Sequence, residues 1–271
     1  MKSIQTDTMI YLVALVLSSL LVAANARANT LFSAELTGNY TAGDFGSTDT
    51  TRTFKSTLFL GYYPNDTIDF GLALSHLYLS NSSAAWSGNL FVDRRGSGVP
   101  ASGSTSNSNE SVNGPGDIEL SANLGLCKET AQRPAFRFFG KVKLPTADED
   151  KGLGTGETDY TAGIGLSKWL GSWLIKSEGS YVLQGNNDQL KLDDYTTYEI
   201  SLGYLFRQEL LGEIRYWGAT EPAGGIGSLG ELHLELTSWL NSSSGISLNA
   251  VAGLTTGSLD YGFGGSVFVN F

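Results

Sequence analysis

The last fourteen residues, SLDYGFGGSVFVNF from Ser258 to Phe271, alternate between two kinds of side chain. One face of an extended strand would carry Leu259, Tyr261, Phe263, Val267, Val269 and Phe271, and the other Ser258, Asp260, Ser266 and Asn270. A strand in lipid pairs its backbone with neighbouring strands, so its outward side chains are apolar while its inward ones are free to be polar. The stretch therefore predicts a transmembrane strand that ends on an aromatic residue.

The same alternation recurs along the chain, and no amphipathic helix interrupts it. It predicts twelve strands, at residues 30–41, 51–62, 66–80, 116–127, 134–144, 158–168, 172–183, 195–206, 209–219, 230–240, 244–254 and 258–271. In the stretch 116–127, the apolar face holds Ile118, Leu120, Ala122, Leu124 and Leu126. Alternation alone does not separate a barrel in lipid from a soluble sandwich, because both have one apolar face.

The connections between the predicted strands do separate the two folds. Those at one rim are short, at 63–65, 128–133, 169–171, 207–208 and 241–243, and those at the other are longer, at 42–50, 81–115, 145–157, 184–194 and 220–229, with 255–257 as the exception. This asymmetry is typical of bacterial outer-membrane barrels with both termini in the periplasm. We predict an all-β fold, a closed antiparallel transmembrane β-barrel of about 12 strands in the bacterial outer membrane.

The N-terminus predicts a secretory signal peptide over residues 1–28, which leaves 29–271 as the barrel. An apolar run from Met9 to Ala24 follows Lys2 and precedes small residues up to Ala28. The alternative is an uncleaved anchor helix, but this run falls short of the roughly twenty residues that a span needs. Residues 29–271 hold 15 basic and 26 acidic residues, a net charge of −11. Because nucleic-acid binding needs a basic surface, we expect no nucleic-acid partner.

Cofactor and metal sites are not predicted. The acidic runs Asp148-Glu149-Asp150 and Asp193-Asp194 lack the spacing of an EF-hand loop and are taken as solvated charge. Gly152 to Gly156 reads GLGTG, but a strand follows it where a nucleotide-binding loop would have a helix. The only cysteine, Cys127, excludes a disulfide within the chain.

The long connection at 81–115 is rich in Ser, Gly and Asn and has two interpretations. It is either a lid over the mouth of the barrel or a solvated surface loop. We favour the solvated loop, with a short strand extension near Trp86 to Val92.

The polar face of the strands predicts the lining of the lumen. Our candidates are Glu119, Arg137, Lys141, Lys143, Glu199, Glu213, Arg215, Glu231, His233 and Glu235. Charges on neighbouring strands can pair, and we expect Glu119 to pair with Arg137 or Lys141, and Arg215 with Glu231 or Glu235. The lining is either a polar path for a solute or a ladder of ion pairs that fills the interior.

An enzymatic function is the alternative to transport. Some twelve-stranded barrels of the outer membrane are lipases that use a serine and a histidine. Only His76 and His233 are present as a base. His233 is predicted to face the lumen, where no phospholipid lies, and the residues around His76 have no known catalytic spacing. We therefore predict that the protein is not an enzyme.

Two stretches in the middle of the chain carry a family resemblance. GDIELSANLGL begins at Gly116, and FGKVKLPTADEDKGLGTGETDYTAGIGLSK runs from Phe139 to Lys168. They resemble a family of outer-membrane barrels labelled with the meta-pathway of phenol degradation and regarded as transporters. The matching positions are Gly116, Asp117, Lys143, Leu144, Pro145, Thr146, Asp148, Gly154, Thr155, Gly156 and Asp159, while Ala147 replaces the family's usual glycine. The resemblance implies movement of hydrophobic or aromatic compounds, and we assign Pro145 and the glycines to loop geometry.

From these observations we predict an outer-membrane channel or facilitator for passive uptake of small, hydrophobic or aromatic molecules. The alternative is a non-conducting surface or structural barrel whose acidic outer loops bind partners. Expected partners are outer-membrane lipid and lipopolysaccharide, a small-molecule solute, and the barrel-insertion machinery, which would contact the strand that ends at Phe271. We expect a monomer.

Overall fold

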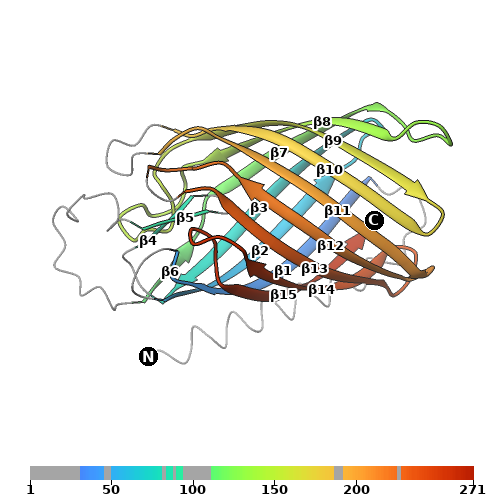
Figure 1. Cartoon of the computed structure of the whole chain (residues 1–271). Helices are drawn as coiled ribbons and strands as arrows, with labels where there is room; N and C mark the ends of the chain where they lie inside the picture. The colour runs from blue at the N-terminus through green and yellow to red at the C-terminus, as the bar shows by residue number, and fades with distance from the viewer. Residues whose placement is uncertain are drawn as a thin grey trace.

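The chain folds into a closed barrel of tilted strands with loops at one end and tight turns at the other (Figure 1). The computed structural model describes residues 31–45, 50–80, 84–87, 90–93, 111–185, 192–224 and 227–271. The predicted signal peptide lies outside these residues. No helix in this described part of the chain is long and apolar enough to cross a membrane.

The described strands keep the alternation that the sequence shows. They are β1 (Phe32–Gly43), β2 (Thr51–Tyr62), β3 (Ile68–Leu79), β4 (Ala84–Ser87), β5 (Leu90–Asp93), β6 (Val112–Pro115), β7 (Ile118–Cys127), β8 (Ala135–Leu144), β9 (Asp159–Leu170), β10 (Trp173–Leu183), β11 (Tyr195–Arg207), β12 (Leu210–Ala219), β13 (Leu229–Trp239), β14 (Ser244–Gly253) and β15 (Tyr261–Asn270). Each of the twelve predicted strands is present, with ends within three residues of those predicted.

The sheet closes on itself because its first strand pairs on both sides. β1 is antiparallel to β2 and to β15, and every further neighbour in the ring is antiparallel as well. At the rim with the short turns, the amide of Phe32 donates to the carbonyl of Phe271 at 2.9 Å, and the amide of Phe271 donates back at 2.8 Å. A closed ring has no unpaired edge strand, which lipid could not solvate.

One predicted boundary is wrong at the last strand. β15 begins at Tyr261, three residues later than the predicted start at Ser258. The Ser258 hydroxyl lies 3.0 Å from the carbonyl of Gly230 and is buried, and the amide of Asp260 donates to the carbonyl of Ala42. These bonds tie the segment to its neighbours as a loop, so the connection before β15 is longer than predicted.

The predicted loop 81–115 also ends differently, because its last residues belong to the wall. β6 pairs with residues 76–79 of β3, at the long-loop end of the barrel. β7 pairs with residues 68–73 of β3, nearer the short turns. The register shifts by one residue between the two pairings, at Gly116 and Asp117, which is the geometry of a β-bulge. β6 and β7 therefore form one strand position with a bend, and the ring has twelve positions.

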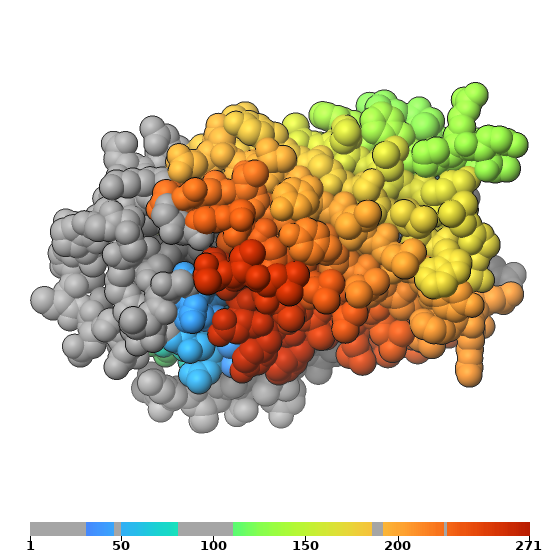
Figure 2. Space-filling view, in the orientation of Figure 1, coloured from blue at the N-terminus to red at the C-terminus, as the bar shows by residue number. Residues whose placement is uncertain are grey.

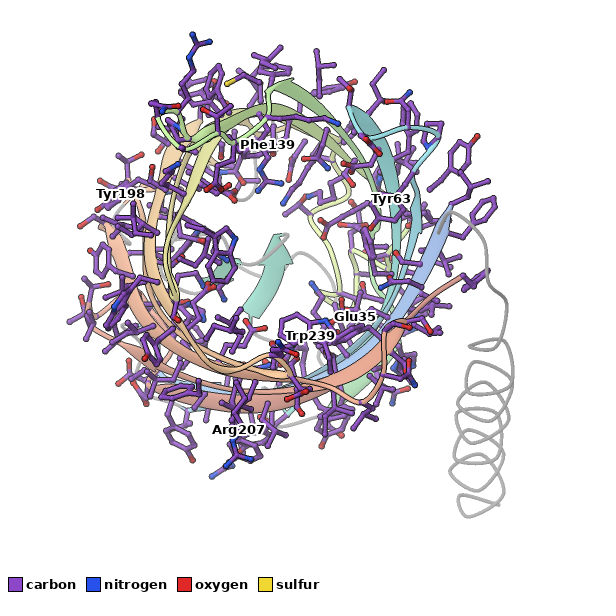
Figure 3. The ribbon with its side chains drawn as sticks, turned by 90° about the vertical axis from the view of Figure 1, so that its right-hand side faces the viewer. Glu35, Tyr63, Phe139, Tyr198, Arg207 and Trp239 are labelled. Atoms are coloured by element: carbon purple, nitrogen blue, oxygen red, sulfur yellow. The ribbon has the colours of Figure 1, made fainter. Side chains whose placement is uncertain are left out.

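The rest of this connection contains the short hairpin of β4 and β5. The two strands pair only with each other. They lie at the long-loop end of the barrel in Figure 1 and appear inside the ring when the barrel is viewed along its axis in Figure 3. The backbone of this hairpin therefore lies over the mouth at the long-loop end.

The outer surface of the barrel is apolar. Along each strand, every second side chain points outward, as Leu120, Ile200 and Leu248 do. These outward side chains are exposed, Ile200 by 59% and Leu248 by 62%. Figure 2 shows the side chains of β11 to β15 forming one continuous outer surface. A monomeric soluble protein rarely leaves so much apolar area open to water, and here the large side chains are spread around the ring. The wall is built to face hydrocarbon, as in an outer-membrane barrel.

Aromatic residues gather near the rim with the short turns, as expected at a membrane interface. The rings of Trp173 and Tyr204 are 4.7 Å apart, edge to face, and both lie beside turns. Trp239 also lies at this rim but points into the ring (Figure 3). Its register partner is Gly245, on the inner face of the wall.

Candidate functional site

The ten candidate residues all lie on the face opposite the exposed apolar side chains. The register sets them there: Glu119 on β7; Arg137, Lys141 and Lys143 on β8; Glu199 on β11; Glu213 and Arg215 on β12; and Glu231, His233 and Glu235 on β13. Figure 3 shows Glu35 and Phe139 pointing into the ring and Tyr198 and Arg207 pointing away from it. We treat this inner face as the candidate site.

Arg137 pairs with Glu178, and the pair joins two strands that are not neighbours. Arg137 on β8 lies opposite Gly165 on β9, which in turn lies opposite Glu178 on β10. A Cβ atom on Gly165 would lie 2.8 Å from the Arg137 Nε atom, so the glycine leaves room for the arginine to cross β9. The predicted pair of Arg137 with Glu119 is wrong, because the register places Arg137 opposite Gly125, near the other end of β7.

Three further pairs follow the inner wall toward β13. Lys176 Nζ lies 2.8 Å from Glu213 Oε2, Arg215 Nε lies 3.8 Å from Glu199 Oε2, and His233 Nε2 lies 3.0 Å from Glu231 Oε2. The ion pair of Arg215 is thus made on the β11 side of its strand, and the predicted pairing with Glu231 or Glu235 on β13 is wrong. Glu235 instead accepts a bond from the Thr237 hydroxyl at 3.2 Å.

Lys143 is the centre of the most buried polar cluster in the described structure. Its Nζ atom lies 2.7 Å from Asp159 Oδ2, 3.7 Å from Asp117 Oδ2 and 2.9 Å from the Thr155 hydroxyl. Lys143 is 5% exposed, Asp159 7% and Asp117 8%. Buried charges need partners of this kind, because an unpaired charge away from water is costly.

Asp117 connects this cluster to the connection between β8 and β9, residues 145–158, which we call the inner loop. One oxygen of Asp117, Oδ1, accepts the backbone amides of Thr146 at 3.0 Å and Ala147 at 2.9 Å. A Cβ on Gly154 would lie 2.8 Å from the Asp117 carboxylate and 2.8 Å from the Ala147 side chain. Glycine at this position therefore allows the close approach of the loop.

The tip of the inner loop packs against the inner face of β3. Leu153 is fully buried and forms a cluster with Leu77 and Leu79, against which Val112 and Phe45 also pack. The strand order is β8, β7, β3, so the loop reaches across a whole strand position from where it begins. This path takes the loop inside the outer mouth.

A second group of loops meets beside the first. Gln184 Nε2 donates to the carbonyls of Asp193 and Pro222 at 2.7 Å each, and the amide of Gly185 donates to Asp159 Oδ1 at 3.0 Å. Pro222 is fully buried. Asp159 therefore links the Lys143 cluster to the connection between β10 and β11, and Gln184 links that connection to the one between β12 and β13.

Aromatic side chains also reach the inner face. The ring of Phe139 is nearly buried, with the Arg137 guanidinium carbon 5.5 Å and the Lys141 Nζ 5.9 Å from its centre. A cation near an aromatic ring is attracted to the ring's face. Phe139 is accommodated because its register partner on β9, Gly163, has no side chain.

The remaining candidate chemistry is limited. His76 has the outward parity of Leu74 and Tyr78, and His233 is held by Glu231. Among the residues that the structure describes, no three His, Cys, Asp or Glu side chains are placed to hold a metal ion. In the exposed part of the inner loop, a hydrogen bond from Lys151 holds the pKa of Asp148 below its usual value.

Three residues of this inner face were missing from the predicted set. Asp117 and Asp159 were matched as family positions, but each is the second residue of its predicted strand, and neither was included among the lining candidates. Glu178 lies on β10, a strand that contributed none of the ten predicted lining residues. All three are charged residues on the inward side of the wall, and the register between strands decides which lysine or arginine each of them meets.

The family signature therefore occupies one place in the fold, the Lys143 cluster and the inner loop. Residues 84–225 match the family described as "Putative MetA-pathway of phenol degradation". The chain belongs to this family. No curated protein matches the sequence.

Among solved structures, this family member is similar to the COG4313 outer membrane channel from Pseudomonas putida F1. The two share 11% identity with a TM-score of 0.68, over 92% of this chain and 98% of that chain. The CymD monoaromatic hydrocarbon channel has a TM-score of 0.49 at 8% identity, over 90% and 89%. The P. putida toluene transporter TodX has a TM-score of 0.45 at 11% identity, over 91% and 80%. At 11% identity, the likeness to the COG4313 channel shows a shared fold, that of an outer-membrane barrel.

Proposed function

We propose that this family member is a passive channel in the outer membrane for small molecules with little or no charge, including aromatic compounds. The observation that carries the proposal is the pairing of charges along the inner face. Arg137, Lys143, Lys176 and Arg215 each have a carboxylate partner within the wall. A lining neutralised in this way offers few free countercharges to an ion, so it favours solutes that need none.

The family label and the fold support the same proposal. The label concerns phenol degradation, and phenol is a small aromatic molecule with a largely apolar surface. The similar barrel from P. putida is an outer membrane channel. The ten candidate residues would then line the path of the solute, with Phe139 as an aromatic contact on it.

Purified protein in liposomes tests this function. The efflux of entrapped radiolabelled phenol or toluene is compared with the efflux of small charged solutes. Heat-unfolded protein serves as the control for leakage. Because phenol also crosses lipid unaided, neutral sugars of graded size should be entrapped in parallel. Sugar efflux above the control supports a channel, and efflux equal to the control for every sugar contradicts it.

The alternative function is a non-conducting barrel, and the loops at the outer mouth favour it. The inner loop packs on the inner face of β3 through Leu153 and thereby occupies part of the outer mouth. Planar-bilayer conductance distinguishes the two functions. Stable steps of current support the channel, whereas insertion without current supports the surface barrel.

Assembly would use the closing strand. Phe271 stacks on Phe32 with ring centres 6.1 Å apart, beside the backbone bonds that close the ring. We propose that the barrel-insertion machinery recognises this strand, that the mature protein is a monomer, and that its acidic outer loops meet lipopolysaccharide through bridging cations. Deleting Phe271 should slow assembly in cells without changing the conductance of protein refolded in detergent.

A further inference from the structure

The inner loop is fixed at both ends by one cation. Lys143 is the second-last residue of β8, before the loop, and Asp159 is the first residue of β9, after it. Their ion pair closes the loop at its base, and the bond from Lys143 to Thr155 holds the returning arm. Lys143 therefore contacts both sides of the loop.

The tip is fixed by a separate, apolar contact on another part of the wall. Leu153 is buried between the inward side chains Leu77 and Leu79 of β3. A Cβ on Gly114 would lie 2.7 Å from a Leu153 methyl carbon, so the leucine lies directly over the β6 backbone. With a base on β8 and β9 and a tip on β3 and β6, the loop covers the inner wall along the outer end of β7.

From this geometry we infer that Lys143 is a positioning residue for a fixed constriction, in which Leu153 and its loop set the size of solute that enters the barrel. The inference rests on the proposed channel function and adds to it the element that limits passage. Lys143 acts through the loop and need not touch the solute. When its charge is removed, Asp117 and Asp159 repel each other, the base of the loop opens, and the tip leaves β3.

The test measures single-channel conductance and the size limit for neutral sugars in full-length protein. Lys143→Met should raise conductance several-fold and admit larger sugars. The matched control is Lys128→Met, because Lys128 is exposed, lies at the rim with the short turns and pairs there with Asp66. The control should keep the conductance and size limit of the unchanged protein.

A cross-link separates loop position from general damage to the barrel. Leu77→Cys and Leu153→Cys are combined with Cys127→Ser, which removes the native thiol. Oxidation should join the two cysteines, visible as a change in gel mobility, and leave conductance as in the unchanged protein. Added to Lys143→Met, the oxidised cross-link should restore the smaller conductance, and reduction should release it again.

The possible outcomes separate this inference from the proposed function. Unchanged conductance in Lys143→Met, or failure of the cysteines to join, overturns the inference while leaving the channel in place. If the unchanged protein gives no current and the Lys143→Met variant does, the inference is supported. The unchanged barrel is then closed in the absence of the substitution. If both are silent although the cross-link forms, the loop is not what limits passage and the inference is overturned.

Discussion

Lys143 Nζ lies 2.7 Å from Asp159 Oδ2, and both side chains are almost completely buried. The two residues are the register partners that begin the β8 and β9 pairing at the outer end of the wall. Asp117 adds a second carboxylate at 3.7 Å. A single lysine thus pairs with carboxylates from both of its neighbouring strand positions at the outer end of the wall.

Removal of this lysine should destabilise the barrel measurably. Lys143→Met leaves two buried carboxylates without their cation, which costs about 3–5 kcal/mol of unfolding free energy for a pair broken on one side. Urea unfolding in detergent micelles, followed by the gel-mobility difference between folded and unfolded barrel, measures the loss. Asp159→Asn should cost less, because Asp117 still pairs with the lysine. Equal stability of Lys143→Met and the unchanged protein would contradict this account of the cluster.

Substitutions at adjacent positions of β11 should differ in their cost to folding free energy, because one position faces lipid and the other faces the interior. Ile200 is exposed on the outside, whereas Glu199 faces inward beside Arg215. Ile200→Arg places a charge in hydrocarbon and should cost about 2–4 kcal/mol if it lies near the bilayer midplane. Glu199→Gln should cost less, since its side chain stays in the polar interior. Folding titrations into lipid vesicles give both values, and a reversed order would rule out the assigned parity.

Reversal of charge on β8 should change ion selectivity if the inner face lines a path. Lys141→Glu adds a carboxylate close to the Phe139 ring, and Arg137→Glu removes the partner of Glu178. Both changes should shift the reversal potential in a potassium chloride gradient toward cation preference. Lys128→Glu is the control, because Lys128 lies in an exposed turn beside Asp66. An unchanged reversal potential in both β8 variants would remove these residues from the path.

A methyl group at Gly163 should disturb the aromatic ring that it faces. Its Cβ would lie 2.3 Å from the ring of Phe139 and 2.7 Å from the Ser180 Cβ. Gly163→Ala therefore forces the ring aside and should cost about 1–3 kcal/mol through overpacking. Gly179→Ala is the control, since the nearest atom to its Cβ is 3.9 Å away. The same urea titration reports both, and a loss no larger at Gly163 than at Gly179 would show that the ring moves freely.

The alternation of side chains was enough to predict the strands and their two faces. The positions of Leu120 and Ile200 require an apolar side chain because they face lipid. This requirement does not depend on which strand lies beside them. The lengths of the connections predicted the orientation of the barrel in the membrane, because short and long connections alternate along the chain. These features depend on residues close together in sequence, so the sequence shows them directly.

The partners on the inner face were decided only by the tertiary structure. Arg137 reaches Glu178 across β9 because Gly165 is there, and Arg215 turns to Glu199 and not to Glu231. Pairing of this kind depends on the register between strands, which the period of two leaves open. The same holds for the bulge at Gly116 and Asp117, which divides one position of the wall into β6 and β7.

The path of the inner loop is the clearest case. The sequence marked Lys143, Thr155 and Asp159 as family positions, yet nothing in their spacing shows that they meet. Leu153 looks like an isolated apolar residue in a polar connection, and its contact partners on β3 are more than seventy positions earlier in the chain. Closure of the ring brings these segments together, and burial of one leucine then holds the loop inside the mouth.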